Sequence, residues 1–299
     1  MVEEILSKWV RACCQKTGLS RVCFSGGVAQ NIKACKVLSE LDCVEDIYVC
    51  PAGGDTSISI GACYWAMWDY LHRMNLPKEV IRPLENIYLG PEFPPEEIER
   101  ATQEKGLASK YSVKREVQDR EIARLISEGN VIARCCGRME FGLRALGNRS
   151  ILADPRRPSI VPKINSQIKF RDFWMPFTPT ILAEREGDYL VNPKHLKSPF
   201  MAMAFDSTEF ARKDLVAALH PADFTARPQI LERHRNPRYY DLIKAFEGIT
   251  GVGGILNTSL NLHGAPIALG PREAITTFEH SELDGLLLEN CLIMRPPKT

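Results

Sequence analysis

The sequence predicts an α/β protein. Strands of the buried type run into glycine turns and then into helical patterns, first at RVCFSGG and DIYVCPAGGD and again where VIARCC leads into GRMEFG. This alternation is typical of folds in which helices cover a sheet. The composition agrees, because 299 residues with 44% hydrophobic and 25% charged residues suit one large or two ordinary globular domains.

The first part of the chain contains five predicted elements. These are helices over 2–17, 28–41 and 56–74 and strands over 21–27 and 46–51. The first helix is expected to end at Gly18, because glycine readily adopts the left-handed conformation that ends helices. Five prolines in 74–95 indicate a connector. We therefore expect one domain over 1–75, a connector over 76–104 and a second domain over 105–299.

The second domain repeats the α/β pattern. Helices are predicted over 118–128, 239–249 and 271–281, and strands over 131–136, 198–205, 255–259 and 286–294. Gly129 ends the first of these helices. Pro271 stands near the start of the last one, where the missing N–H group costs little. No element is predicted within 137–157, whose apolar residues follow neither a helical nor a strand spacing.

Positive charge is concentrated in one region of this domain. Residues 134–171 contain nine lysines and arginines against two acids, whereas the whole chain has a net charge of +1. A focused positive site on a neutral body suits a small polyanion better than a long nucleic acid, which usually requires a broad basic face. Nucleic acid is therefore not expected as a partner.

The arginine-rich segment GRMEFGLRALGNRS is the strongest candidate for a binding site. Its glycines can give a ligand access to the loop, and its arginine forks can bind phosphate oxygens in pairs. The alternative is a solvated loop with structural ion pairs. Segments KFRDFWMPF, DFTARPQ and NTSLNLHG add further polar candidates. The whole set is Arg138, Glu140, Arg144, Arg149, Lys169, Arg171, Arg227, Asn257 and Ser259.

Two glycine turns form a second candidate site. FSGGVAQN and PAGGD each follow a strand, so both are expected at the carboxyl edge of one sheet, where α/β proteins bind ligands. Backbone N–H groups at such turns can bind an anion, although ordinary tight turns have the same composition. Asp55 could simply cap the helix that follows. The candidates here are Gly26, Gly27, Asn31, Gly53, Gly54 and Asp55.

Several common classes of protein are excluded. The ten cysteines contain no C-x-x-C pair and are expected to be reduced and apolar in role. The six histidines lack the spacing of a metal-binding pair, and neither a G-x-S-x-G elbow nor a P-loop occurs. No apolar run reaches the roughly 18–20 residues that a membrane span requires, and the N-terminus lacks a signal-peptide pattern. We expect a cytoplasmic protein without a membrane partner.

The motifs resemble those of the NodU/CmcH-type O-carbamoyltransferase family. The resemblance rests on GRMEFGLRALGNRSILADPR, INSQIKFRDFWMPFTP, SPFM, TARPQ and LNTSLNLHGAPI in this order, together with SGGVAQN and PAGGD followed by ISIGA. It covers nearly the entire chain. It implies that 1–75 is the end of an actin-like (ASKHA) domain and that 105–299 is a YrdC-like α/β domain.

The resemblance also implies a reaction. The YrdC-like domain would form carbamoyl-adenylate from carbamoyl phosphate and ATP with Mg²⁺, and the actin-like domain would pass the carbamoyl group to a hydroxyl of a small-molecule acceptor. That second step uses an iron-type metal. Residue by residue, the resemblance implies phosphate binding by Arg138, Lys169 or Arg171, Arg227, Asn257 and Ser259, and metal binding by Asp55.

The chain departs from the family pattern in ways that limit this expectation. Leu143 stands where the family usually has proline, and Leu260 and Ala265 stand where it tends to have phenylalanine and glutamate. The metal-binding histidine pair is missing, so we expect a C-terminal piece that retains carbamoyl activation and holds the metal only in a full-length protein.

Two alternative functions stay open, a non-catalytic nucleotide-binding or partner-binding remnant and a relative of the tRNA threonylcarbamoyl transferases. The acceptor stays open as well, and a homodimer is one alternative for the oligomeric state.

Overall fold

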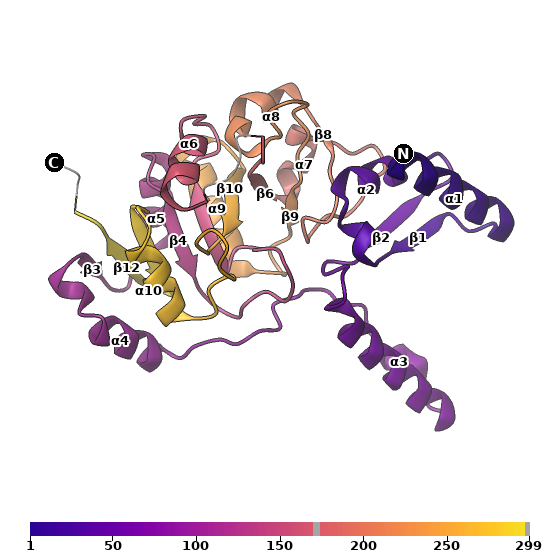
Figure 1. Cartoon of the computed structure of the whole chain (residues 1–299), viewed down its shortest axis with the longest axis horizontal. Helices are drawn as coiled ribbons and strands as arrows, with labels where there is room; N and C mark the ends of the chain where they lie inside the picture. The colour runs from indigo at the N-terminus through magenta and orange to yellow at the C-terminus, as the bar shows by residue number, and fades with distance from the viewer. Residues whose placement is uncertain (170–173, 297–299) are drawn as a thin grey trace.

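The computed structural model describes residues 1–169 and 174–296. A small N-terminal part lies beside a larger body that is built on an eight-stranded sheet (Figure 1). The predicted α/β class is confirmed. The boundaries expected at 75 and 105 stay predictions.

The N-terminal part follows the predicted order of elements. Its elements are α1 (Val2–Thr17), β1 (Arg21–Phe24), the 3-10 helix η1 (Gly27–Gln30), α2 (Ile32–Ser39), β2 (Asp46–Val49) and α3 (Ser57–Arg73). Strands β1 and β2 pair in parallel. Helix α1 ends at Gly18 with a φ of 70°, as predicted. Helix α2 starts later than expected, because Asn31 is the non-helical cap and its side chain accepts a hydrogen bond from the N–H group of Ala34 at 3.1 Å.

Helix α3 projects away from the rest of the molecule (Figure 1). Leu71 is its one buried residue, whereas Trp65, Met67 and Tyr70 are at least half exposed. The rings of Trp65 and Trp68 stack with centroids 5.2 Å apart. A helix with large apolar side chains on its exposed surface is typical of a segment that packs against another polypeptide.

The body contains a mixed sheet. Its strand order is β3 (Ser112–Lys114), β12 (Cys291–Met294), β11 (Gly285–Leu288), β4 (Ile132–Cys135), β5 (Arg149–Ala153), β10 (Gly254–Ser259), β6 (Thr178–Leu182) and β9 (Gln229–Leu231). The pairs β11–β4 and β6–β9 are parallel, and the other neighbours are antiparallel. The central strands β4, β5 and β6 are buried along their whole length.

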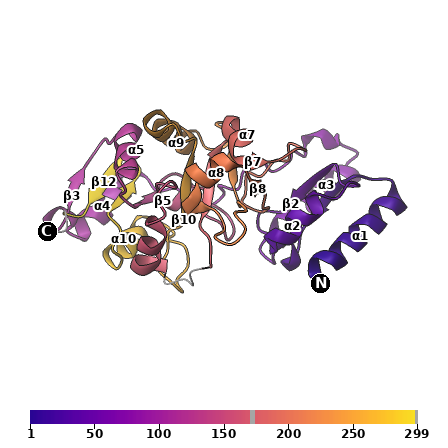
Figure 2. The same ribbon diagram turned by 90° about the horizontal axis from the view of Figure 1, so that it is seen from above.

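Helices cover both faces of this sheet. Helices α5 (Asp119–Ser127) and α9 (Pro237–Thr250) lie on one face, and α4 (Pro95–Glu104), α6 (Ile160–Ile164) and α10 (Pro271–Glu279) lie on the other (Figure 2). Adjacent strand residues accordingly join different apolar clusters, as Ile255 and Leu256 do. Burial on both faces explains why these strands contain continuous apolar runs rather than alternating patterns.

Shorter elements complete the described chain. They are η2 (Lys78–Val80), η3 (Leu107–Ser109), the π-helix η4 (Asn165–Lys169), η5 (Ala183–Arg185), α7 (Glu186–Tyr189), β7 (Leu190–Val191), β8 (Asp206–Ser207), α8 (Glu209–Asp214) and η6 (Val216–Ala218). The segment 76–104, which we expected to be a connector, contains all of α4. That helix buries Ile98 and Ala101 in the core of the body.

Two predicted strands need correction, and other strands of the sheet were not predicted. Residues 198–205 form no strand, although Phe200, Met201 and Met203 are buried. Pro199 lacks an N–H group and Met201 has a φ of 55°, so this run is irregular up to a single bridge between Phe205 and Ala226. Residues 286–294 are part of a hairpin of two strands, β11 and β12. Strand β5 was missed, because its buried first residues are Arg149 and Ser150 and do not look like core residues.

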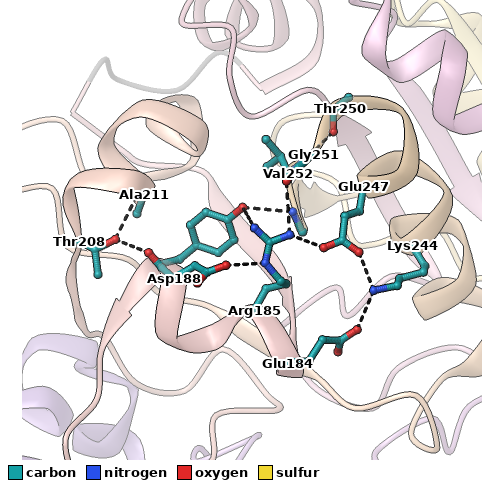
Figure 3. A network of polar contacts seen from close by, with 12 residues as sticks. Glu184, Arg185, Asp188, Thr208, Ala211, Lys244, Glu247, Thr250, Gly251 and Val252 are labelled. Atoms are coloured by element: carbon teal, nitrogen blue, oxygen red, sulfur yellow. Dashed lines mark hydrogen bonds and ion pairs between the residues drawn. The ribbon is translucent and has the colours of Figure 1, made fainter.

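A charged network attaches the segment after β6 to the end of α9 (Figure 3). The guanidinium of Arg185 donates to Asp188 and Glu247 and to the carbonyl oxygen of Gly251. Lys244 of α9 bridges Glu247 at 2.6 Å and Glu184 at 3.1 Å. The segment that follows β6 is thereby held against one of the helices that cover the sheet.

Lys194 joins the body to the N-terminal part. Its ammonium group donates to the carbonyl oxygens of Ser39, Leu41 and Val44 at 2.7–2.8 Å. These carbonyls lie at and just beyond the end of α2, where helix carbonyl groups lack partners and the helix dipole is negative. A second link across the same boundary is the ion pair between Lys33 and Asp223 at 2.6 Å.

We expect Lys194→Met to lower the free energy of unfolding by about 1–3 kcal/mol, because three carbonyl oxygens lose a charged donor. Thermal and urea denaturation measure the change. Lys197→Met is the matched control, since Lys197 belongs to the same segment but its side chain is 75% exposed. Equal stability of the two variants would show that Lys194 does not hold α2.

Candidate functional site

A cavity of about 420 Å³ lies between the N-terminal part and the body. Helix α2 contributes Ile32 and Lys33. The body contributes the arginine-rich segment 137–150, called here the arginine loop, together with the start of β6, the segment before β9 and the end of β10. Asn257 of β10 pairs with Thr178 of β6. The two central strands therefore present polar residues side by side at the cavity wall.

The wall of this cavity is cationic. Arg144, Arg227 and Lys33 line it together with His220, and none of its described lining residues is acidic. Polar Asn257 and Ser259 complete the predicted residues found there. This combination suits an anionic ligand with hydrogen-bonding groups.

Lys169 contacts this wall through Ser259. It is 1% exposed, and its ammonium group donates to the carbonyl oxygen and hydroxyl of Ser259 at 2.6 and 3.1 Å and to the side-chain oxygen of Asn261 at 2.7 Å. A buried cation thus lies directly beside Ser259. The structure brings Arg144, Lys169, Arg227, Asn257 and Ser259 together from segments that are far apart in the sequence.

Glu140 organises the arginine loop rather than lining the cavity. One carboxylate oxygen, Oε1, accepts hydrogen bonds from the backbone N–H groups of Leu146, Asn148 and Arg149 at 2.7, 2.8 and 3.3 Å. Its neighbour Tyr88 donates its hydroxyl to the carbonyl oxygen of Leu146 at 2.8 Å. Burial, and to a lesser extent the charge of Glu140, raises the pKa of the Tyr88 phenol, so this donor keeps its proton.

The guanidinium group of Arg149 is surrounded by main-chain carbonyl oxygens. It is 1% exposed, and its guanidinium donates to main-chain carbonyl oxygens of Cys136, Gly137, Asn148 and Leu269 at 2.9–3.1 Å. It does not line the cavity. These contacts explain its burial without a phosphate ligand, so the binding role predicted for it has no support from its position.

Arg138 faces the segment that precedes α4. Its guanidinium donates to the carbonyl oxygens of Leu89 and Gly90 at 3.0 and 3.1 Å. The backbone of Met139 pairs with Gly90 and Pro91 in the same place. Arg138 therefore holds this segment against the arginine loop and lies outside the cavity lining. Arg171, the remaining basic candidate, lies outside the described residues.

The two glycine turns lie against each other, as expected for one sheet edge. A side chain at Gly53 would come within 3.1 Å of the carbonyl oxygen of Gly26. The PAGGD turn also touches the arginine loop, since a Cβ atom at Gly142 would lie 3.0 Å from that of Ala52. A crevice of only about 20 Å³ runs from Gly53 to Arg144, which also lines the main cavity.

The other candidate residues of these turns differ in the free space beside them and in the contacts that they make. Gly26 has a φ of 96°, and there is open space beside both Gly26 and Gly27. A side chain at Gly54 would contact Gln30, and the side chain of Asn31 is used to cap α2. Nucleotide binding by these turns stays a prediction.

Asp55 is exposed and lies in the turn before α3. Across residues 1–169 and 174–296, no group of three or more histidine, cysteine, aspartate or glutamate side chains is arranged to hold a metal ion. One carboxylate does not fit a transition metal, which generally requires three or four protein ligands. The metal role of Asp55 stays a prediction for a longer protein.

Sequence reasoning missed Lys33 and His220 as cavity residues. The carboxylate of Asp223 accepts from Lys33 at 2.6 Å and from the hydroxyl of Thr225 at 2.7 Å. Burial by itself disfavours the charged carboxylate, but these hydrogen bonds outweigh it and lower the pKa of Asp223. No pattern in the sequence places α2 beside residues 220–225, so only the tertiary structure could reveal this contribution.

The cysteines are free thiols in the structure. Cys135 and Cys136 lie next to the arginine loop, and both are buried. Burial raises the pKa of the Cys135 thiol to about 12, so it carries no thiolate at neutral pH. Within the described chain, no helix combines the length and the apolar character that crossing a membrane would demand.

Two family models match the chain. Residues 1–64 match the model described as Carbamoyltransferase N-terminus, and residues 123–295 match the model described as Carbamoyltransferase C-terminus. A solved structure of full-length HypF in its phosphate- and nucleotide-bound form is 16% identical and covers 60% of this chain and 22% of HypF, with a TM-score of 0.42. That likeness is too weak to bear on function.

Curated proteins are similar over nearly the whole chain. An uncharacterized protein of Methanocaldococcus jannaschii is 37% identical over 98% of this chain and 48% of its own length. Nodulation protein NolO of Bradyrhizobium diazoefficiens is 34% identical over 99% of this chain and 53% of its own length. Nodulation protein NolNO of Sinorhizobium fredii is 34% identical over 98% and 42%.

The chain thus spans about half the length of the curated relatives that it matches. The region matched by the C-terminal family model contains the arginine loop and every body residue identified above at the cavity wall. Because this match alone covers more than half of the 299 residues, the chain belongs to the carbamoyltransferase family.

Proposed function

We propose that the cavity binds carbamoyl phosphate and ATP and forms carbamoyl-adenylate. The observation that carries this proposal is the presence of Arg144 and Arg227 in a cavity without described acidic lining residues, where buried Lys169 contacts Ser259 of the wall. Both substrates are polyanions, so their encounter requires cations that reduce repulsion and stabilise the charge that develops in the transition state. The family membership supports the carbamoyl group as the transferred unit.

The balance of the reaction defines what the site must hold. Carbamoyl phosphate, ATP and one water give carbamoyl-adenylate, pyrophosphate and orthophosphate. Arg144 and Arg227 would bind phosphate oxygens, and Ser259, held by Lys169, would donate a further hydrogen bond. Because no described lining residue is acidic, Mg²⁺ would enter with the phosphates of ATP rather than on a protein carboxylate.

The second half of the reaction is a proposal for a longer protein. There the carbamoyl group would pass to a hydroxyl of a small-molecule acceptor, with the glycine turns at 26–27 and 53–54 binding nucleotide. An iron-type metal would require ligands that accompany Asp55 from outside this chain. The contact between the PAGGD turn and the arginine loop supports a short path between the two sites. We place the reaction in the cytoplasm, where ATP is available.

Isotope exchange tests the activation step. We expect the purified chain to incorporate labelled pyrophosphate into ATP only when carbamoyl phosphate and Mg²⁺ are present. Omitting carbamoyl phosphate, or replacing it with orthophosphate, provides the control. ATP binding without any exchange in the presence of carbamoyl phosphate would contradict the proposal.

A partner-binding role is the second candidate, and the exposed side chains of α3 favour it. Trp65 and Tyr70 are 66% and 55% exposed on a helix that projects from the molecule (Figure 1). If this face binds a second copy of the chain, sedimentation will detect a dimer that Trp65→Glu dissociates. A monomeric protein at all concentrations would exclude the homodimer.

A further inference from the structure

We infer that Lys33 leaves its partner Asp223 and pairs with a phosphate group when a ligand enters the cavity. The N-terminal part thereby supplies a ligand-binding residue to a site that otherwise belongs to the body. This inference rests on the proposed function, because it takes the ligand of the cavity to be a polyanion. It goes further by assigning a change of partner to one ion pair at the boundary between the two parts of the molecule.

Lys33 lies at the edge of the cavity. It is the second residue of α2 and lines the cavity, and its ammonium group contacts one carboxylate oxygen of Asp223 at 2.6 Å. The other carboxylate oxygen accepts from the hydroxyl of Thr225 at 2.7 Å and lies 3.2 Å from Nδ1 of His220. Thr225 and His220 line the cavity as well. Only the width of one carboxylate therefore separates the ammonium group from two other lining side chains.

The ion pair between Lys33 and Asp223 is weak enough to be broken by a ligand. The two side chains are 49% and 40% exposed. Exposed ion pairs contribute little, because the surrounding water screens the charges and because holding two side chains in one geometry costs entropy. The ammonium group of lysine stands on a flexible four-carbon stem, so it can reach a new partner by rotation of the side chain alone.

The backbone of α2 stays in place during this change. Lys194 donates to carbonyl oxygens at and beyond the end of α2, and Lys36, three residues after Lys33, pairs with Asp206 of the body at 3.0 Å. The side chain of Lys36 is only 14% exposed and does not line the cavity. These two contacts hold α2 against the body, so Lys33 can change partner without a movement of the helix.

The charge of the ligand favours the new pair. A phosphate group carries up to two negative charges and three acceptor oxygens, whereas the carboxylate of Asp223 carries one charge. Arg144 and Arg227 line the same cavity and attract such a group. When Lys33 leaves, Asp223 still accepts from the backbone N–H group and the hydroxyl of Thr225 at 3.0 and 2.7 Å. The carboxylate is therefore not left without hydrogen bonds.

The test is isothermal titration with pyrophosphate in the absence of Mg²⁺, because the two members of the pair should then have opposite effects. Lys33→Met should weaken binding by about 10-fold, since the ligand loses a charged donor. Asp223→Asn should strengthen binding by about 3- to 10-fold, since it removes the charge that competes for Lys33. The asparagine oxygen can still accept from Thr225. An ion pair with a purely structural role predicts the same direction for both variants.

A double variant and a control accompany these measurements. In Lys33→Met/Asp223→Asn, the gain from the second substitution should fall below about 2-fold, because the residue that the ligand recruits is absent. Lys36→Met is the matched control, since it breaks an ion pair between the same helix and the body outside the cavity lining. It should keep the wild-type affinity within about 2-fold, whatever happens to its melting temperature.

The outcomes separate this inference from the proposed function. Weaker binding in both single variants, or an unchanged affinity in Lys33→Met, would overturn the change of partner. The proposed function stays intact in that case if the wild-type chain still incorporates pyrophosphate into ATP in the presence of carbamoyl phosphate. A wild-type chain that neither binds pyrophosphate nor incorporates it into ATP would overturn the two together.

Discussion

Arg227→Ala is expected to lower carbamoyl phosphate-dependent pyrophosphate exchange by about 1000-fold, which corresponds to roughly 4 kcal/mol of transition-state stabilisation. Arg227 lines the cavity together with Asn257 and Ser259, and its guanidinium can bind two phosphate oxygens at once. Loss of this charge leaves the repulsion between the two polyanionic substrates less compensated. The rate is measured at saturating ATP, with the melting temperature recorded in parallel.

The lysine variant separates charge from geometry. Arg227→Lys should retain more activity than the alanine variant but still lose about 10- to 100-fold, because an ammonium group lacks the planar fork. Arg272→Ala is the control, since Arg272 is an exposed partner of Glu104 and does not line the cavity. If Arg227→Ala exchanges at nearly the wild-type rate in a folded protein, Arg227 is not part of the phosphate site.

Arg149→Met is expected to have the largest effect on stability, a loss of about 3–4 kcal/mol in the free energy of unfolding. The methionine fills much of the volume but leaves carbonyl oxygens of Cys136, Gly137, Asn148 and Leu269 without their charged donor. Urea denaturation measures the loss. Arg124→Met should change stability by less than about 0.5 kcal/mol, because the Arg124 side chain is 62% exposed.

This experiment also decides between the two roles of Arg149. The sequence indicates a phosphate ligand, whereas the structure surrounds the guanidinium with main-chain oxygens. A structural role requires that stability falls while the residual folded protein still binds orthophosphate. Unchanged stability combined with lost phosphate binding would restore the prediction made from the sequence.

Much of the fold follows from local patterns. Helical spacing with a terminal glycine placed α1 correctly up to Gly18, and glycine turns after apolar strands placed β1 and β2. Such signals are local, because capping and side-chain periodicity depend on residues only a few positions apart. The same reasoning failed at β5, whose buried Arg149 resembles a surface residue until its carbonyl partners are known.

In the candidate site too, the sequence identified some residues correctly, whereas the role of others was visible only in the structure. Residue chemistry in the sequence identified Arg144, Arg227, Asn257 and Ser259, all of which line one cavity. Arg138 has the same chemistry but a different role, since its guanidinium binds the carbonyl oxygens of Leu89 and Gly90.

The sequence by itself thus determined the α/β class, the membership in the carbamoyltransferase family and the residue types available for binding anions. Only the tertiary structure decided which arginines line the cavity, that Lys33 of α2 lines it too, and that Arg149 is enclosed by main-chain carbonyl oxygens. The physical reason is that a guanidinium or an amide has several donors and acceptors whose partners come from distant segments. Its role is therefore set by the groups that folding brings next to it.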